Sequence, residues 1–153
     1  MKTWIALLLL AAPTAIASEK TAVAVVVDWS NPRTDITSAE LRAIYLGQQR
    51  EWADGSRIVA LELEAGAPEH DAFNSAVLEM SQPDIDRYWV DQRMRGASGA
   101  PRTAPTPGSL MKLAGKVKGV IGYVPLKAVD ASVKVLKVDG VAPGKPGYAI
   151  EVD

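Results

Sequence analysis

The chain has 153 residues, with 17 basic and 18 acidic side chains, a net charge of −1, one histidine and no cysteine. A balance this close to neutral excludes the basic footprint of nucleic-acid-binding proteins. The absence of cysteine excludes disulfides and thiolate zinc sites. The single histidine, His70, leaves little for a histidine metal site or a catalytic triad. We therefore expect no cofactor, no metal and no nucleic-acid partner.

The first residues have the three parts of a secretory signal peptide. Lys2 supplies the basic start, residues 4–12 form a short apolar run, and Ala15 and Ala17 are the small residues before a cut after Ala17. The run is far shorter than the ~20 residues that span a bilayer. We expect residues 1–17 to be removed, and the rest to be a periplasmic or secreted protein without a membrane span.

The first half of the remaining chain predicts a strand, a turn and a helix. Residues 22–27 form a continuous apolar run rich in β-branched valine, which is typical of a strand buried on both faces. An Asn-Pro turn follows. Thr37 and Glu40 have the spacing of a capping box, and Gly47 is placed to end the helix that Thr37 begins.

The middle of the chain continues this alternation. Residues 52–56 predict a turn that leads into a strand over residues 58–63. A helix is expected over residues 69–80 from its apolar stripe, and another starts near Pro83. Residues 96–108 are rich in Gly, Pro, Ser and Thr and predict an exposed loop.

The last part predicts a short helix over residues 109–114, a buried strand over residues 119–125 and a half-exposed strand over residues 133–138. Strands and helices alternate without an internal repeat, which favours a layered α/β architecture. The length left after signal removal, residues 18–153, suits one domain with one core.

A resemblance to a known family is carried by a series of short segments in order: VVDWSNP (26–32), LRAIYLG (41–47), WADGSRI (52–58), DAF (71–73), YW (88–89) and GVIGYV (119–124). Together they resemble the phosphate-type substrate-binding proteins of ABC transporters, whose members hold an anion between two lobes. The resemblance implies one α/β lobe, like the second domain of a type II periplasmic binding protein, with a central mixed sheet flanked by helices.

The resemblance also implies an anion site at a helix start. In the family, a Gly-Ser-Gly-Thr-Arg turn surrounds the ligand with hydroxyls, backbone N–H groups and a guanidinium, where the helix dipole favours an anion. The matching stretch here runs from Gly66 and Ala67 through Pro68 and Glu69 to His70. It has no hydroxyl, Pro68 lacks an N–H donor, Glu69 adds negative charge, and His70 replaces the arginine.

Two further candidates come from the end of the first strand, where Ser30 and Asn31 either offer donors to the cleft or form the turn before Pro32. The predicted ligand residues are therefore Ser30, Asn31, Gly66, Ala67 and His70. No Gly-x-Ser-x-Gly elbow and no supported carboxylate pair is present, so we predict no catalytic residues and no enzymatic activity.

Two functions remain open. The first is weak binding of a small anion such as phosphate, with an ABC transporter permease as partner. In the second, the lobe has lost ligand binding and is an interaction module for another envelope protein or for a second copy of itself. For the stretch from Gly66 to His70, the alternative to a degenerate anion site is a helix start that Glu69 and Asp71 stabilise through its dipole.

Arginines 87, 93, 95 and 102 gather before and within the predicted loop. One interpretation is a basic patch that binds phosphate groups or an acidic partner. The other is a solvated face with mixed ion pairs, which is the more common arrangement.

Overall fold

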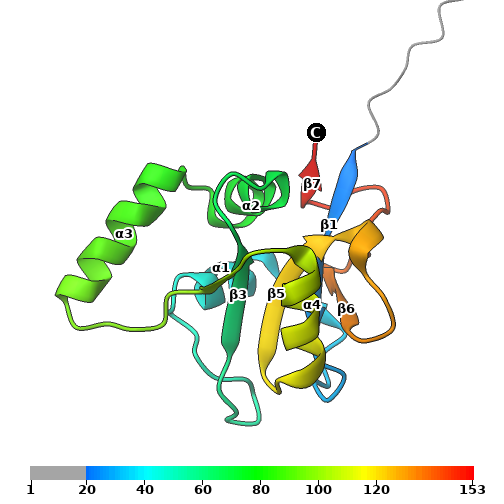
Figure 1. Cartoon of the computed structure of the whole chain (residues 1–153), viewed down its shortest axis with the longest axis horizontal. Coiled ribbons are helices and arrows are strands. Elements are labelled where there is room, and N and C mark those ends of the chain that lie inside the picture. The colour runs from blue at the N-terminus through cyan, green and yellow to red at the C-terminus, as the bar shows by residue number, and fades with distance from the viewer. Residues whose placement is uncertain (1–19) are drawn as a thin grey trace, which may run out of the picture.

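A computed structural model describes residues 20–153 (Figure 1). The predicted signal peptide, residues 1–17, lies outside them. In chain order the elements are β1 (Thr21–Val27), β2 (Asp35–Ile36), α1 (Ser38–Tyr45), β3 (Val59–Leu63), α2 (Pro68–Phe73), the π-helical turn η1 (Asn74–Leu78), α3 (Gln82–Met94), β4 (Arg102–Ala104), α4 (Pro107–Lys116), β5 (Val120–Pro125), the 3₁₀ turn η2 (Leu126–Ala128), β6 (Lys134–Val138) and β7 (Glu151–Val152).

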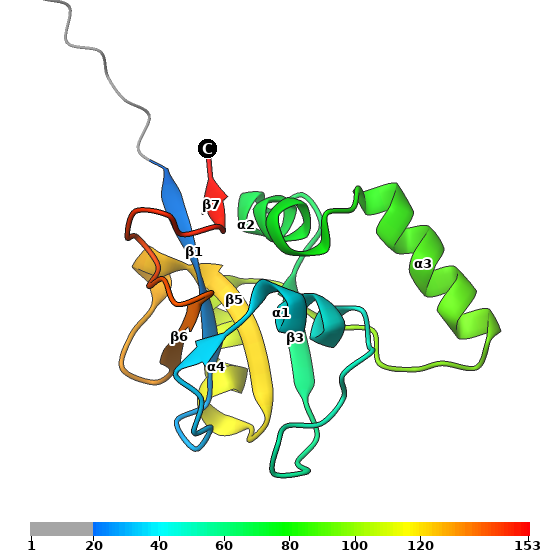
Figure 2. The same ribbon diagram turned by 180° about the vertical axis from the view of Figure 1, so that it is seen from behind.

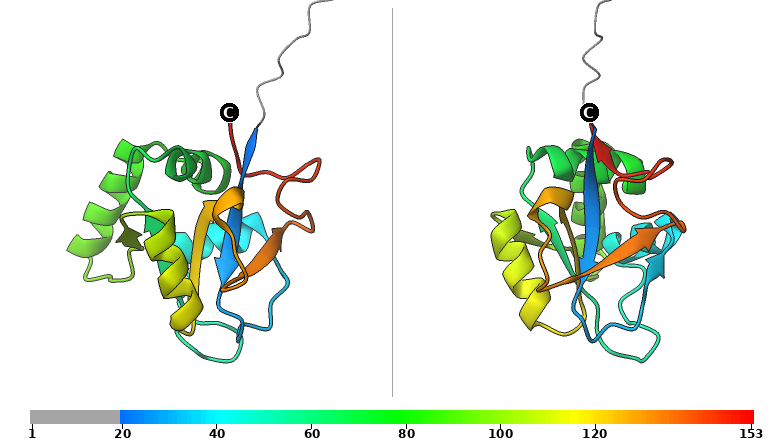
Figure 3. Two further views of the ribbon diagram at one scale, coloured as in Figure 1. Left: turned by 45° about the vertical axis from the view of Figure 1, so that its right-hand side comes forward. Right: turned by 90° about the vertical axis from the view of Figure 1, so that its right-hand side faces the viewer.

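The strands form one mixed sheet in the order β2-β6-β1-β5-β3-β4, with β7 paired to β1. Strand β1 is antiparallel to β5 and β6, whereas β3 is parallel to both β5 and β4. Helices α4 and α1 lie on opposite sides of the sheet (Figure 3), and α3 projects from one side of the body (Figure 2). The expected α/β lobe with a central mixed sheet flanked by helices is confirmed.

The core is centred on β1 and β5. Residues 22–27 of β1 are all buried, as its β-branched sequence predicts, and so is every residue of β5. Gly122 on β5 allows a close approach between a helix and the sheet. A Cβ there would lie 2.6 Å from Leu110 Cδ2, so α4 packs directly on the β5 backbone.

Helix α1 begins and ends as the sequence predicts. The Thr37 hydroxyl accepts a hydrogen bond from the Glu40 amide at 3.1 Å, and the chain turns away from the helix at Gly47. The Glu40 carboxylate does not return the bond to the cap. It pairs instead with Arg33, whose Nη1 and Nη2 lie 2.9 and 2.6 Å from Oε1 and Oε2.

The helix expected over residues 69–80 begins one residue earlier, at Pro68, and ends at Leu78. Its second half, η1, is π-helical, and Glu79 closes it with a φ of 54°. The bulged turn brings Val77 and Leu78 into the core, where they are buried. The α-helical spacing predicted from the sequence therefore holds only for the first part of this helix, α2.

The expected loop over residues 96–108 contains a strand, since β4 pairs with β3 in the register Leu61–Arg102 to Leu63–Ala104. Helix α4 begins at Pro107 rather than at residue 109, because Thr106 caps it by accepting a hydrogen bond from the Ser109 amide at 3.1 Å.

The C-terminal segment returns to the start of β1. Tyr148 and Ile150 are buried, and the Tyr148 hydroxyl donates to the Val23 carbonyl at 2.7 Å. Thr21 is then paired with Val152. Within residues 20–153, none of the helices combines the length and the apolar character needed to cross a bilayer.

Candidate functional site

The residues predicted to bind a ligand lie at opposite ends of the sheet. Ser30 and Asn31 follow the end of β1, whereas Gly66, Ala67 and His70 follow the end of β3. Strand β5 is antiparallel to β1 and parallel to β3, so β1 and β3 run in opposite directions. Figure 1 shows α2 at the top of the sheet and the loop after β1 at the bottom. The structure therefore does not bring the two groups together.

The start of α2 offers few donors to an anion. Its N-cap, Ala67, has no capping side chain, and Pro68 at the first helical position has no N–H. The amides of His70 and Asp71 donate to the Ala67 carbonyl at 3.0 and 3.2 Å. Glu69 and Asp71 place two carboxylates in the first turn. These charges stabilise the helix by interacting favourably with its dipole, and they repel an anion from the helix N-terminus.

The His70 side chain is buried between its own helix and β3, and its Nδ1 lies 3.5 Å from Asp71 Oδ1. It is only 3% exposed, and its Nδ1 lies 3.3 Å from Asn74 Nδ2, one turn further along the helix. Its Nε2 lies 3.9 Å from Glu62 Oε2 on β3. In this structure the imidazole is a packed interior group.

Glu62 is the most perturbed carboxyl group near this end of the sheet. Its pKa is raised to about 7, chiefly by burial; a hydrogen bond from Thr103 lowers the pKa, and the Asp86 charge adds to the rise. The Thr103 hydroxyl donates to Oε1 at 3.4 Å. The alternation of β3 places Glu62 on the opposite face from its buried neighbours, but no sequence motif marked it.

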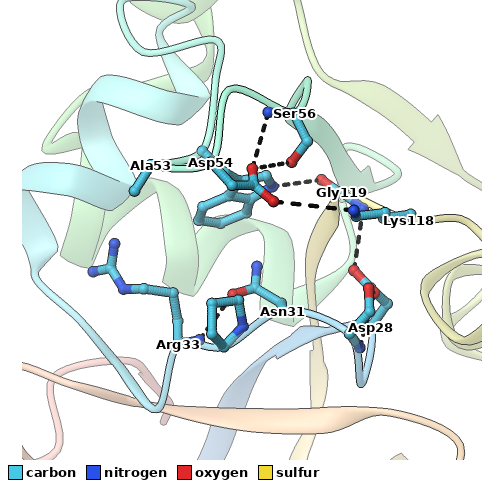
Figure 4. A pocket seen from close by; sticks show the side chains of 11 residues that line it. Asp28, Asn31, Arg33, Ala53, Asp54, Ser56, Lys118 and Gly119 are labelled. Carbon is cyan, nitrogen blue, oxygen red and sulfur yellow. Dashed lines mark hydrogen bonds and ion pairs between the residues drawn. The ribbon is translucent and has the colours of Figure 1, made fainter.

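The strand-end pocket, shown in Figure 4, lies at the other end of the sheet and is built around Asp28. Asp28 is buried; its Oδ1 accepts from the Gly119 amide at 3.1 Å, and its Oδ2 accepts from the Ser30 amide at 3.1 Å. Asn31 Oδ1 accepts from the Arg33 amide at 3.0 Å. Ser30 and Asn31 thus organise the turn that follows β1.

The opposite wall of this pocket comes from the turn over residues 52–56. The Trp52 indole donates to the Gly119 carbonyl at 3.1 Å, and Lys118 Nζ lies 4.0 Å from Asp54 Oδ2 (Figure 4). The enclosed space is about 40 Å³. A water needs about 10–15 Å³ of such space, so the pocket has room for a few waters. The hydrogen bonds around the pocket connect the loop after β1 and the turn before β3 through Gly119.

The four arginines grouped in the sequence separate in the structure. Arg87 pairs with Asp84 at 3.2 Å and Arg95 with Asp91 at 3.0 Å on the exposed surface of α3, as expected for a solvated face. Arg102 lies on β4. Arg93 lines a surface hollow that does not include Arg102. Within residues 20–153, no group of three or more His, Asp or Glu side chains is placed to hold a metal ion.

No protein-family model and no curated protein sequence matches the chain. Among solved structures, it is similar to the phosphate-bound structure of a substrate-binding protein of the phosphate ABC transporter type from Clostridium perfringens, with 23% identity and a TM-score of 0.71 over 87% of this chain and 53% of that one. An ABC-type phosphate transport receptor from Vibrio cholerae gives 21% identity and a TM-score of 0.71, with 87% and 54% coverage. PstS from Borrelia burgdorferi gives 14% and 0.70, with 88% and 55% coverage.

These similarities establish the fold. The chain spans about half the length of the proteins that it matches, which agrees with one lobe of a two-lobed architecture. The resemblance inferred from the sequence motifs is thereby confirmed at the level of the fold. The matched proteins are named for phosphate binding or transport rather than for catalysis.

Proposed function

We propose that the chain is an exported lobe of the solute-binding type that binds small oxyanions weakly and acts alongside an ABC transporter. The observation that carries this proposal is the likeness over 87% of the chain to a structure with bound phosphate. The signal-like first seventeen residues support delivery to the periplasm or beyond.

The expected weakness of binding follows from the start of α2. An anion leaving water must regain its hydrogen bonds from the protein. Here Pro68 supplies no donor, the His70 and Asp71 amides already donate to Ala67, and the Glu69 carboxylate lies in the first turn. Such a site supports only weak binding of an anion.

Titration calorimetry with inorganic phosphate tests this proposal. We expect weak heat with the unaltered chain and roughly two- to fivefold tighter binding for Glu69→Thr, because the variant removes a charge at the helix N-terminus. Glu79→Asn is the control, since it removes one carboxylate from an exposed residue beyond the C-terminal end of η1, and asparagine tolerates the φ of 54° there. Phosphate binding should be unchanged in this variant. No heat at millimolar phosphate would refute oxyanion binding.

The second candidate function, an interaction module, is favoured by a hollow at the α2 end of the sheet. It has a volume of about 630 Å³ and lies between α2–η1 and the C-terminal segment. Lys20, Asp71 and Glu151 contribute both signs of charge to its lining, and the Tyr148 ring adds an apolar wall. A surface with both signs of charge can pair with a second copy of itself.

Light scattering after gel filtration tests self-association. We expect a dimer in which Ser75→Arg, placed on the lining of this hollow, increases the monomer fraction. Thr34→Arg, at an exposed position outside the hollow, is the control and should not. A chain that is monomeric at all concentrations would exclude self-association as the role of this module.

A further inference from the structure

Three arginines from separate segments surround one hollow on the surface. Arg50 follows α1, Arg57 precedes β3, and Arg102 begins β4. The hollow has a volume of about 60 Å³, and the backbone at Gly47 and Gly99 forms part of its wall. We call it the arginine hollow. Its arginines are exposed to solvent, so a ligand can reach them directly.

The lining of the arginine hollow carries positive charge only; Glu51, the β-bridge partner of Arg57, lies outside the lining. No acidic residue lines it, and among residues 20–153 none of its three arginines forms an ion pair, in contrast to Arg33, Arg87 and Arg95. The chain as a whole is slightly acidic, with a net charge of −1. Like charges repel when they gather without a counter-ion, so this arrangement favours an external anion.

Gln49, the other polar side chain of the lining, leads to a carboxylate outside the hollow. Gln49 donates its amide to Glu40 Oε1 at 3.1 Å. The Glu40 carboxylate is itself paired with Arg33, and the Arg33 hydrogen bond lowers the pKa of Glu40. The Glu40 carboxylate is therefore already neutralised by the Arg33 guanidinium.

Arg50 is held in place before any ligand binds. Its Nη2 donates to the carbonyl and to the hydroxyl of Ser98, the latter at 2.9 Å. The glycine at position 99 makes this approach possible, because a Cβ there would lie 2.6 Å from Nη2. The Nε and Nη1 donors of Arg50 are not used by Ser98 and remain for a ligand. A guanidinium ordered in advance loses less entropy on binding.

The size and chemistry of the arginine hollow fit a tetrahedral oxyanion. Since a water needs about 10–15 Å³, the space exceeds that of a single water several times. Guanidinium groups bind the oxygens of phosphate-like anions through paired N–H donors. We propose that the arginine hollow binds one tetrahedral oxyanion, phosphate or the phosphoryl group of a phosphomonoester, between Arg50, Arg57 and Arg102.

This inference deepens the proposed function and rests on it, because it names a site for the oxyanion that is separate from the start of α2. Arg102 pairs in the sheet with Leu61, two residues before the end of β3, and Arg57 lies before the start of β3. His70 and Glu69 lie beyond the end of β3, so variants at the two places report on different sites.

Calorimetry with inorganic phosphate at low ionic strength, on the full chain without its signal, tests the proposal. Arg57→Gln and Arg102→Gln should each weaken binding by about tenfold or more, as expected for losing a hydrogen bond to a charged group. The double variant should show no heat. Arg87→Gln removes the same charge from α3 and is the matched control, with unchanged affinity expected.

Two further arms identify the source of the oxyanion. Sulfate should compete with phosphate, whereas phenyl phosphate should bind at least as well if the phosphoryl group of a larger molecule is the natural ligand. Affinity should fall as salt is raised, because exposed charges are screened. Far-ultraviolet circular dichroism should show that each variant is folded.

The outcomes separate this inference from the proposed function. If phosphate binds equally to the unaltered chain and to both arginine variants, the arginine hollow is not the site, while oxyanion binding itself stands. If the arginine variants lose affinity and Glu69→Thr leaves it unchanged, the arginine hollow is the site and α2 is not. If the unaltered chain binds neither phosphate nor phenyl phosphate, both proposals are wrong.

Discussion

The Nε2 atom of His70 lies 3.9 Å from Oε2 of Glu62, although the two residues belong to different elements. Glu62 is on β3 and His70 is on α2. Asn74 Nδ2 lies 3.3 Å from Nδ1 and 3.5 Å from Nε2 of the same imidazole. The contact joins the helix to the sheet through a carboxyl group whose pKa burial has raised to about 7.

Stability should therefore depend on pH through Glu62. In the unfolded chain this group loses its proton near 4.5, whereas in the folded protein it keeps it to about 7. Between these values the folded state binds more protons, so the free energy of unfolding falls as pH rises; the contribution is complete below 4.5 and lost above 7. Its ceiling is about 3 kcal/mol.

Urea unfolding below pH 4.5 and above pH 7 measures this dependence. Glu62→Gln should flatten the pH profile and be more stable than the unaltered chain above pH 7, because the amide carries no charge to bury. Glu64→Gln is the control, since Glu64 is exposed just after the same strand. An unchanged profile in Glu62→Gln would show that another group causes the pH dependence.

The ion pair between Arg33 and Glu40 should make a measurable contribution. Both guanidinium nitrogens contact the carboxylate, at 2.9 and 2.6 Å, and both side chains are at least two-thirds buried. We expect a coupling of about 1 kcal/mol in a double-mutant cycle with Arg33→Met and Glu40→Gln. The coupling should vanish in acid, as Glu40 is protonated below its lowered pKa. A coupling indistinguishable from zero at neutral pH would contradict this.

Phe73 should be one of the most sensitive core positions. Its ring is stacked on Tyr123 with centroids 4.2 Å apart and lies 4.6 Å from the Tyr45 centroid. Phe73→Ala removes a buried ring and leaves a cavity, so we expect a loss of about 3–5 kcal/mol in urea unfolding. Phe73→Leu, which fills much of the space, should lose less. Equal losses for both variants would mean that ring stacking, not volume, dominates.

The Thr106 cap should contribute a smaller amount. Thr106→Ala leaves the Ser109 amide without its acceptor, and we expect about 1 kcal/mol of destabilisation. Thr34→Ala, a comparable change at an exposed position that caps no helix, should be neutral within error. A neutral Thr106→Ala would indicate that water replaces the cap without loss.

Local sequence signals predicted most of the elements because their causes are local. The β-branched run of β1, the Thr37 cap and the glycine that ends α1 each act within a few residues. Strand β4 has no such signal: its three residues are held by pairing with β3, not by their own pattern. Tyr148 is buried by contacts with β1, far away in the sequence.

The candidate sites were harder to predict, because they depend on strand direction. The sequence shows Asn31 and Gly66 each at the end of a strand, but only the pairing of both strands with β5 places them at opposite ends of the sheet. Arg50, Arg57 and Arg102 form no motif, since their spacing follows from the path of the chain around β3. Burial of His70 likewise depends on Glu62 and Asn74.

The pairing of β1 with β7 has a consequence for how this lobe can be joined to other chains. Thr21 is paired with Val152, and Lys20 Nζ lies 3.4 Å from Asp153 Oδ1, so the first and last described residues are neighbours. Adjacent ends allow a domain to be inserted into a host loop or circularly permuted without unfolding. A permutant that joins residue 153 to residue 20 through a short glycine linker, and opens the chain between Gly96 and Gly99, should keep the same sheet.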